Sequence, residues 1–196
     1  MMSNINTYIQ EICDLSPGQM SFDEREVIYN TISQSGCKNL LVFGAGNDSK
    51  LWSMSSDNTM VLENDRVWLD KISVKYKDIT GLRFMEVVYN MFDTEQECLD
   101  AIKQNDSTKL KVGVCDSVFD IKWDAIIVDS PTGYRDSNEY FRAGSIKLAS
   151  QLASSDCHIF VHDCNRRVEL AAVSEFMSDR QHQSVDRLNI YPKFKV

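Results

Sequence analysis

Short runs of apolar residues alternate with longer amphipathic segments along most of this chain. A run of four to seven apolar residues is typical of a buried strand, and apolar positions three or four residues apart indicate a helix. On this basis we predict strands at 39–43, 59–62, 84–89, 123–129 and 158–161, with helices from about residue 48 and over 66–73, 93–104, 140–153 and 168–178. Strands and helices in this alternation predict an α/β fold, a mostly parallel twisted sheet with helices on both faces.

The two ends of the chain depart from this alternation. A short helix is predicted over 4–13, and Ser16-Pro17-Gly18 ends it. Ser21 and Glu24 then fit a capping box at the start of a helix that runs to about residue 33. We therefore divide the chain into an N-terminal extension, 1–20, and one domain, 21–196, whose tail from residue 184 has room for one or two closing strands.

Glycine and charged residues follow several of the predicted strands. Gly44 and Gly46 come after the first strand, Glu63 ends the second, and Asp129 ends the strand at 123–129. His162 and Asp163 follow the strand at 158–161. Ligands of open α/β sheets bind beyond the carboxyl ends of the strands, so these residues are expected to share one cleft.

The cleft is predicted to bind a nucleoside. Gly44 and Gly46 let the backbone approach such a ligand, and Glu63 can accept hydrogen bonds from ribose hydroxyls. This pattern fits either a nicotinamide dinucleotide or S-adenosylmethionine. Asp48, at the start of the next helix, would repel a pyrophosphate but attract the sulfonium and ammonium groups of S-adenosylmethionine. The predicted donor-binding residues are Phe43, Gly44, Ala45, Gly46, Asp48, Ser49, Glu63, Asn64 and Asp129. The alternative for Asp48 is a helix cap.

Four blocks of sequence, in order, are similar to the plant glucuronoxylan 4-O-methyltransferase family. They are Leu41 to Ser49 with Leu51-Trp52, Val61 to Asp65 with Trp68, Trp123 to Tyr134, and Phe160 to Arg166 with Val168-Glu169. The resemblance covers roughly residues 35–178. It implies a Rossmann-like class I methyltransferase fold, S-adenosylmethionine as donor, and methylation of a hydroxyl on a polysaccharide sugar, typically glucuronic acid.

The departures from that family's pattern lie mainly on the expected acceptor side. Asn47 stands in place of a histidine, and Ser130 and Thr132 replace a glycine and a basic residue. A Pro-Gly-Arg-Met signature is missing after Tyr134, and residues 141–144 match it only in part. We also expect no counterpart of the plant members' membrane anchor. The acceptor sugar therefore stays open.

Methyl transfer to a hydroxyl needs the acceptor oxygen to be aligned with the methyl group of the donor, and it needs a group that takes the hydroxyl proton. His162 is the first candidate for the base, oriented by Asp129 or Asp163; the alternative is that His162 only fixes its loop. A second mechanism places Mg or Mn on Asp129, Asp163 and Asn165, which resemble the oxygen ligands of catechol-type O-methyltransferases; such acids are also common helix caps.

The saccharide acceptor is expected to meet an aromatic ring and arginines, because rings stack on sugars and arginine binds carboxylates in a fork. The predicted contacts are Tyr134, Arg135 and Arg166. The three tryptophans, Trp52, Trp68 and Trp123, are expected to lie in the core.

Composition narrows the function further. The net charge is −8, from 29 acidic and 21 basic residues, which makes nucleic-acid binding unlikely on electrostatic grounds. The six cysteines form no C-x-x-C pair and are expected to be reduced. No apolar run reaches the roughly 18 residues of a membrane span.

We predict a cytoplasmic sugar O-methyltransferase or a domain of a longer one, with no oligomeric state specified. A nicotinamide-dependent sugar oxidoreductase and a non-catalytic glycan- or protein-binding member are the alternatives.

Overall fold

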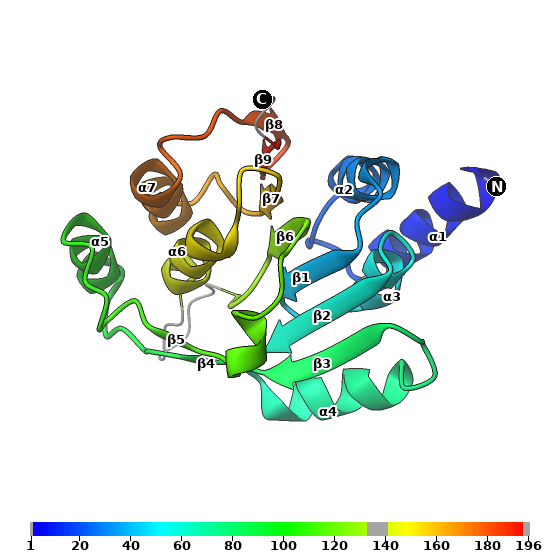
Figure 1. Ribbon diagram of the computed structural model, residues 1–196, viewed down its shortest axis with the longest axis horizontal. Coiled ribbons are helices and arrows are strands. Elements are labelled where there is room, and N and C mark those ends of the chain that lie inside the picture. The colour runs from blue at the N-terminus through cyan, green and yellow to red at the C-terminus, as the bar shows by residue number, and fades with distance from the viewer. Residues whose placement is uncertain (1, 133–140, 194–196) are drawn as a thin grey trace.

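A computed structural model of the chain, which describes residues 2–132 and 141–193, is built on a seven-stranded sheet (Figure 1). Its strand order is β3-β2-β1-β6-β7-β9-β8. The first five strands in this order run parallel, whereas β9 is antiparallel to β7 and β8 is antiparallel to β9. The bounds are β1 Asn39–Phe43, β2 Asn58–Glu63, β3 Leu82–Glu86, β6 Ala125–Val128, β7 His158–Val161, β8 Gln183–Val185 and β9 Leu188–Tyr191. This confirms the predicted fold class and both closing strands.

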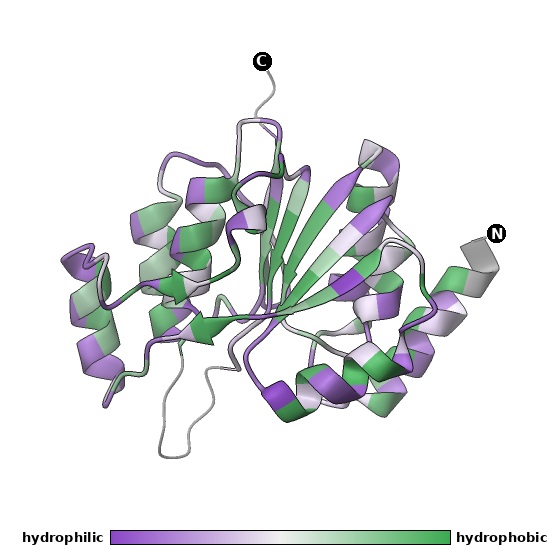
Figure 2. Cartoon of the chain, turned by 60° about the horizontal axis from the view of Figure 1, so that its bottom comes forward, coloured by the Kyte–Doolittle hydropathy of each residue, from purple (hydrophilic) through white to green (hydrophobic). Residues whose placement is uncertain are grey.

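Helices cover both faces of the sheet, because alternate residues of each strand point to opposite sides. Leu41 and Phe43 of β1 pack with α5, α6 and α7, and Leu40 and Val42 pack with α1, α2 and α3. The helices are α1 Met2–Leu15, α2 Phe22–Ser35, α3 Ser49–Ser53, α4 Arg66–Lys75, α5 Glu95–Lys103, α6 Ala143–Leu152 and α7 Arg167–Phe176. Figure 2 shows that the central strands are largely hydrophobic and that the helices carry both hydrophobic and hydrophilic residues.

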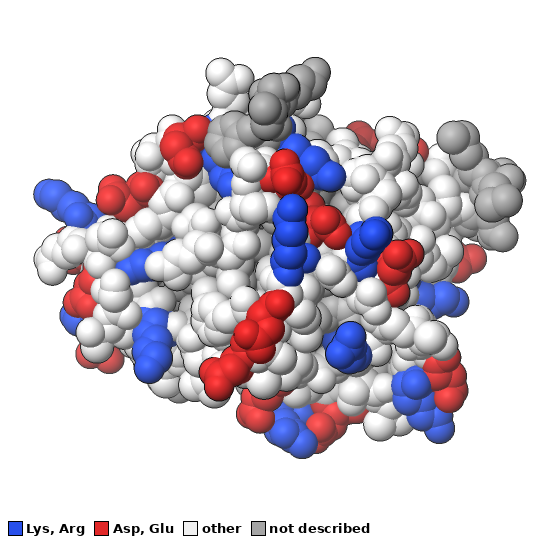
Figure 3. Space-filling model, in the orientation of Figure 1, with Lys and Arg blue, Asp and Glu red and all other residues white. Residues whose placement is uncertain are grey.

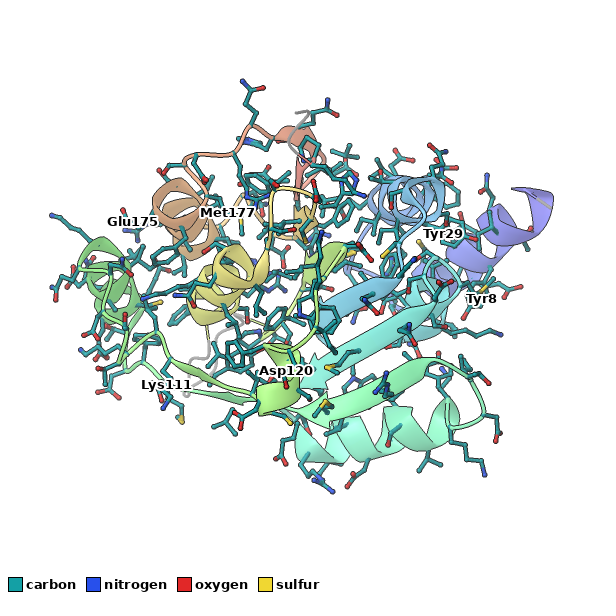
Figure 4. All side chains as sticks on the ribbon, in the orientation of Figure 1. Tyr8, Tyr29, Lys111, Asp120, Glu175 and Met177 are labelled. Carbon is teal, nitrogen blue, oxygen red and sulfur yellow. The ribbon has the colours of Figure 1, made fainter. Side chains whose placement is uncertain are left out.

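The first 20 residues share the core of the domain. Ile9, Ile12 and Met20 are buried in the same apolar cluster as β1. Tyr8 on α1 and Tyr29 on α2 (Figure 4) line a second cavity of about 370 Å³ beside this contact. The segment that the sequence sets apart as an extension therefore packs as part of the same body.

The capping box of α2 forms as predicted. The Ser21 hydroxyl accepts from the Glu24 amide, and the Glu24 carboxylate accepts from the Ser21 amide. At the other end, Gly36 takes the left-handed conformation, with φ of 66°, that commonly ends a helix.

The predicted strand at 84–89 is wrong in its extent. β3 ends at Glu86, and β4, Val88–Tyr89, pairs antiparallel with β5, Val112–Gly113, in a separate small sheet. The apolar pattern continues through Val87, which is buried at the bend, so the pattern does not show where the chain leaves the main sheet. β5 and the short 3-10 helix η1, Asp116–Val118, were not predicted.

Two further expectations concern membranes and cysteines. Among the described residues, none of the helices combines the length and apolar character that crossing a membrane requires. All six cysteines are free thiols, as expected.

Candidate active site

A cleft of about 780 Å³ opens at the carboxyl ends of β1, β2, β6 and β7. Most of the predicted site residues line it, namely Gly44, Ala45, Gly46, Asp48, Glu63, Asn64, Asp129, His162, Asp163 and Arg166. Phe43 and Ser49 are buried behind this lining, and Asn165 is exposed outside it. Tyr134 and Arg135 lie outside the described residues. Residues more than 100 positions apart thus meet in one place because parallel strands end at one edge.

The loop after β1 passes close to the loop after β6. Gly44 has a φ of 116°, and a Cβ there would lie 3.0 Å from the Ser130 Cβ. A Cβ on Gly46 would lie 2.6 Å from Asp48 Oδ1. The Ser49 hydroxyl accepts from the Gly46 amide at 3.0 Å, so Ser49 shapes the loop from behind. Only a glycine-containing loop leaves this space open beside Asp48.

Glu63 fastens the end of β2 to the glycine loop. Its Oε1 accepts from the amides of Asn64 and Asp65 at 2.8 and 2.9 Å, and its Oε2 accepts from the Ala45 amide at 2.9 Å. A carboxylate oxygen can accept two hydrogen bonds, so Oε2 retains capacity for a ligand hydroxyl.

Asp48 is buried in the wall of the cleft rather than capping a helix. Its side chain makes no cap hydrogen bond to α3, which excludes that alternative, and it lies 3.6 Å from Nη2 of Arg25. Burial raises the pKa of Asp48 to about 6, against the opposing charge of Arg25. The buried Arg25 guanidinium donates from Nη1 to the Met20 carbonyl, while its Nε and Nη2 have no hydrogen-bond partner among the described residues.

His162 lies between two carboxylates. Its Nδ1 is 2.8 Å from Asp129 Oδ1, and its Nε2 is 3.3 Å from Glu24 Oε2, close enough for a charge contact. Burial disfavours the charged ring, but the contacts with Asp129 and Glu24 outweigh burial and raise the pKa of His162 to about 9. A ring that already carries its proton at neutral pH cannot take another, so the geometry opposes the expected role of His162 as a base.

Three arginines neutralise the acids on the other side of the cleft. Arg142 bridges Asp129 and Asp163, at 3.2 and 2.8 Å. Arg166 and Arg187 also pair with Asp163, at 2.9 and 3.1 Å. The Asp163 carboxylate therefore forms ion pairs with three guanidinium groups.

The predicted metal ligands are only partly brought together. Ligand atoms of Asp129, His162 and Asp163 lie within 4.8 Å of one another, whereas Asn165 is exposed and does not line the cleft. The bridging Arg142 and the ring of His162 already contact both carboxylates. A divalent cation does not fit this arrangement, because a cation would have to displace positive groups that are already paired.

Two parts of the cleft were not foreseen from the sequence. Trp68 is half-buried, lines the cleft and donates from Nε1 to the Ala45 carbonyl at 2.5 Å, so its expected core position is wrong, whereas Trp52 and Trp123 are buried as expected. Residues 15–19, from the last residue of α1 onward, form another wall. Ser16 accepts from the side chain of Asn47 at 3.1 Å, a contact between distant segments that local patterning does not show.

Comparisons with known proteins agree with this architecture. The family model described as IRX15/IRX15L/GXM matches residues 23–191. Arabinogalactan O-methyltransferase 1 from Arabidopsis thaliana is 30% identical over 180 residues, which cover 81% of this chain and 61% of that protein. Glucuronoxylan 4-O-methyltransferase 2 from the same plant is 31% identical over 170 residues, covering 77% of this chain and 57% of that protein. The chain thus spans about three fifths of these relatives.

Solved structures share the fold at low sequence identity. A Podospora anserina methyltransferase with bound S-adenosylhomocysteine is 12% identical, with a TM-score of 0.57 over 97% of this chain and 88% of that chain. An O-methyltransferase from Bacillus cereus, also in complex with S-adenosylhomocysteine, is 11% identical, with a TM-score of 0.56 over 97% and 91%. The class I methyltransferase fold is therefore confirmed.

Proposed function

The chain belongs to the IRX15/IRX15L/GXM family, and from this premise we propose that it transfers a methyl group from S-adenosylmethionine to a hydroxyl of a polysaccharide sugar. One observation carries the proposal: the glycine loop, Glu63 and Asp129 meet in a single cleft whose wall holds further acids. The names of the relatives, arabinogalactan and glucuronoxylan O-methyltransferases, support a saccharide as the acceptor.

The cleft suits a positively charged donor. Asp48, Glu63 and Asp129 face it, while Arg142 and Arg166 on its walls are paired with carboxylates. Asp48 stays mostly ionised at pH 7, because its pKa of about 6 lies below neutrality. The sulfonium and ammonium groups of S-adenosylmethionine would be attracted by these carboxylates.

A nicotinamide dinucleotide suits the cleft less well. Its pyrophosphate needs a helix N-terminus free of negative charge. Here α3 has only five residues, and the buried carboxylate of Asp48 precedes it. The oxidoreductase alternative therefore meets a like charge where its ligand would bind.

We assign to Asp129 the role of binding the acceptor hydroxyl. Among the described residues, His162 and Arg142 both contact its Oδ1, so we assign Oδ2 to the acceptor hydroxyl. Burial raises the pKa of Asp129, but Arg142 and His162 outweigh burial and hold it below its usual value. Such a carboxylate is a weak base, so its main contribution is to orient the hydroxyl, and alignment alone can supply several kcal/mol. The bound donor would supply the methyl group and leave as S-adenosylhomocysteine. The hydroxyl proton, which becomes acidic as the oxygen gains the methyl group, would pass to Oδ2 of Asp129 and from there to water.

Methyl transfer to a panel of saccharides tests the proposal. We expect labelled product with glucuronoxylan or arabinogalactan oligosaccharides that carry uronate groups, and little with matched oligosaccharides that lack them. Asp129→Asn is the matched variant, expected to lower kcat at least tenfold while the Kd for S-adenosylhomocysteine stays within twofold. Absence of turnover with every acceptor would favour the non-catalytic alternative instead.

We further infer that the reaction needs no Mg or Mn, since arginines and His162 already pair with the acids of the cleft. EDTA is expected to leave the turnover rate unchanged. A rate that falls in EDTA and returns on addition of Mg or Mn would show that these acids release their cationic partners to a metal.

A further inference from the structure

We propose that Glu24 is a positioning residue for Asp129 and that it acts through the ring of His162. Glu24 lies on α2, and Asp129 and His162 directly follow β6 and β7, so the three side chains connect the start of a helix to the floor of the cleft. The proposal rests on the proposed function, in which Asp129 orients the acceptor hydroxyl.

Glu24 is more firmly placed than its capping role requires. Its Oε2 accepts from the Ser21 amide at 2.6 Å, and its Oε1 accepts from the Arg187 amide at 2.9 Å. The residue is 0% exposed. Capping glutamates usually stay in contact with water, because a buried carboxylate is costly unless it is paired. The two backbone donors fix the carboxylate in the orientation that meets His162.

His162 transmits this placement to the cleft. The Nε2 atom is 3.3 Å from Glu24 Oε2, and the Nδ1 atom on the other side of the ring is 2.8 Å from Asp129 Oδ1. The ring is buried, whereas 27% of the Asp129 side chain is exposed. The hydrogen bond at Nδ1 and the ion pair at Nε2, which has no hydrogen-bond partner among the described residues, together restrict the rotation of the ring. The ring in turn holds one oxygen of Asp129.

The other charges around this chain of contacts do not replace Glu24. Asp163 Oδ2 is 3.5 Å from Nδ1, on the Asp129 side of the ring. Arg142 also binds Asp129 Oδ1, at 3.2 Å, and Arg187 Nη2 is 3.8 Å from Glu24 Oε2. Among the described residues, Glu24 is thus the one that forms an ion pair with Nε2 of the ring. Without its charge, Asp129 would keep Arg142 but lose the fixed ring.

Glu24→Gln tests this proposal with Ser21→Ala as its control. Glu24→Gln keeps the size of the side chain and removes its charge, whereas Ser21→Ala weakens the same capping box but leaves the Ser21 amide and the contact with His162. We expect Glu24→Gln to lower kcat at least tenfold, with the acceptor KM and the Kd for S-adenosylhomocysteine within twofold of wild type. Ser21→Ala should lower the melting temperature and leave kcat within twofold.

A double-variant comparison separates positioning from general damage. Because Glu24 acts through the ring, Glu24→Gln combined with His162→Gln should be no slower than His162→Gln alone. Glu24→Asp, which keeps the charge but withdraws it from the ring, should show the same loss as Glu24→Gln and serves if that variant does not fold. A kcat within twofold of wild type in both Glu24 variants, or an equal loss in Ser21→Ala, would overturn the proposal.

NMR gives a readout that needs no turnover. In wild type both ring N–H protons of His162 should exchange slowly with water, and in Glu24→Gln the Nε2 proton should exchange faster and the Asp129 carboxylate carbon should shift. Unchanged signals would overturn the proposal. If the wild-type chain methylates no sugar, the proposed function is refuted. The NMR comparison of wild type with Glu24→Gln would then still decide whether Glu24 positions Asp129.

Discussion

At the scale of single residues, the cleft is governed by buried charges whose partners come from distant parts of the chain. Glu24, His162 and Asp163 are nearly inaccessible to water, and each contacts an opposite charge. Burying such groups is unfavourable without partners, so each pair is more informative for what it fixes in place than for the stability it adds. Removing one partner leaves the other charge buried and unpaired, so the loss of stability is larger than the distance between the two groups alone would suggest.

Glu63→Gln is expected to weaken donor binding and stability together. The variant keeps the shape of the side chain but loses the charge that accepts three backbone hydrogen bonds. Hydrogen bonds to charged groups are worth about 1.5–3 kcal/mol each, so we expect the free energy of unfolding to fall by roughly 2 kcal/mol. Calorimetry with S-adenosylhomocysteine should show a Kd at least tenfold higher. An unchanged Kd would mean that the end of β2 does not contact the donor.

The charged state of His162 predicts how stability changes with pH. Its folded pKa of about 9 lies above the ordinary value of 6.5, so its contribution is complete below about pH 6.5 and is lost as the pH rises to about 9. The difference corresponds to on the order of 3 kcal/mol. Denaturant unfolding of wild type and His162→Gln should therefore differ most near pH 6 and converge above pH 9.

The comparison with His162→Gln is needed because other groups titrate with the opposite sign. Burial lowers the pKa of His158 to about 4, and Glu24 and Asp129 have lowered pKa values, so all three reduce stability as the pH falls. A difference between wild type and His162→Gln that grows between pH 7 and pH 9 would contradict a ring charged by its neighbours.

The residue types of the site could be predicted from the sequence, but several of their roles could not. Parallel strands end at one edge, and this rule alone brings Gly44, Glu63, Asp129 and His162 together. The charge of His162 depends on Glu24, 138 positions earlier by the residue numbers, on a helix whose capping box gives no sign that its glutamate is buried. Contacts of this kind are set by packing rather than by local pattern.

At the scale of elements, the apolar runs located β1, β2, β6 and β7 well because nearly all residues of these strands are buried. The edge strand β3 is only partly buried, and its predicted bounds were less accurate. The pattern was weaker at β4 and β5, two residues each, where the chain leaves the sheet. The helix predicted over 4–13 is confirmed by α1, Met2–Leu15, but its local pattern did not show that it packs into the core of the domain. A helix that covers one end of a sheet and a helix that stands alone have the same local pattern.

Ile12→Ala tests whether α1 is part of the domain. Ile12 is buried against β1 and α2, so its truncation should lower the free energy of unfolding by about 2–5 kcal/mol. Gln10→Ala, on the exposed side of the same helix, should change it by about 0.5 kcal/mol or less. Denaturant unfolding measures both variants. Equal small effects would show that the first 20 residues are an appendage, as the sequence alone suggests.

At the scale of the whole molecule, the sheet gathers negative charge at one end of its strands while the surface stays mixed. Figure 3 shows acidic and basic side chains interspersed over one face, without a broad basic region. The net charge is −8, and five of the acids line the cleft, namely Asp48, Glu63, Asp65, Asp129 and Asp163. This distribution favours a small cationic ligand over a polyanion.

The identity of the ligand in the cleft can be tested directly by titration calorimetry of the wild-type chain with S-adenosylhomocysteine and, in parallel, with NAD. We expect one molecule of S-adenosylhomocysteine to bind per chain and NAD to give no measurable heat of binding at the same concentration. Binding of NAD without binding of S-adenosylhomocysteine would contradict the assignment of the cleft to S-adenosylmethionine.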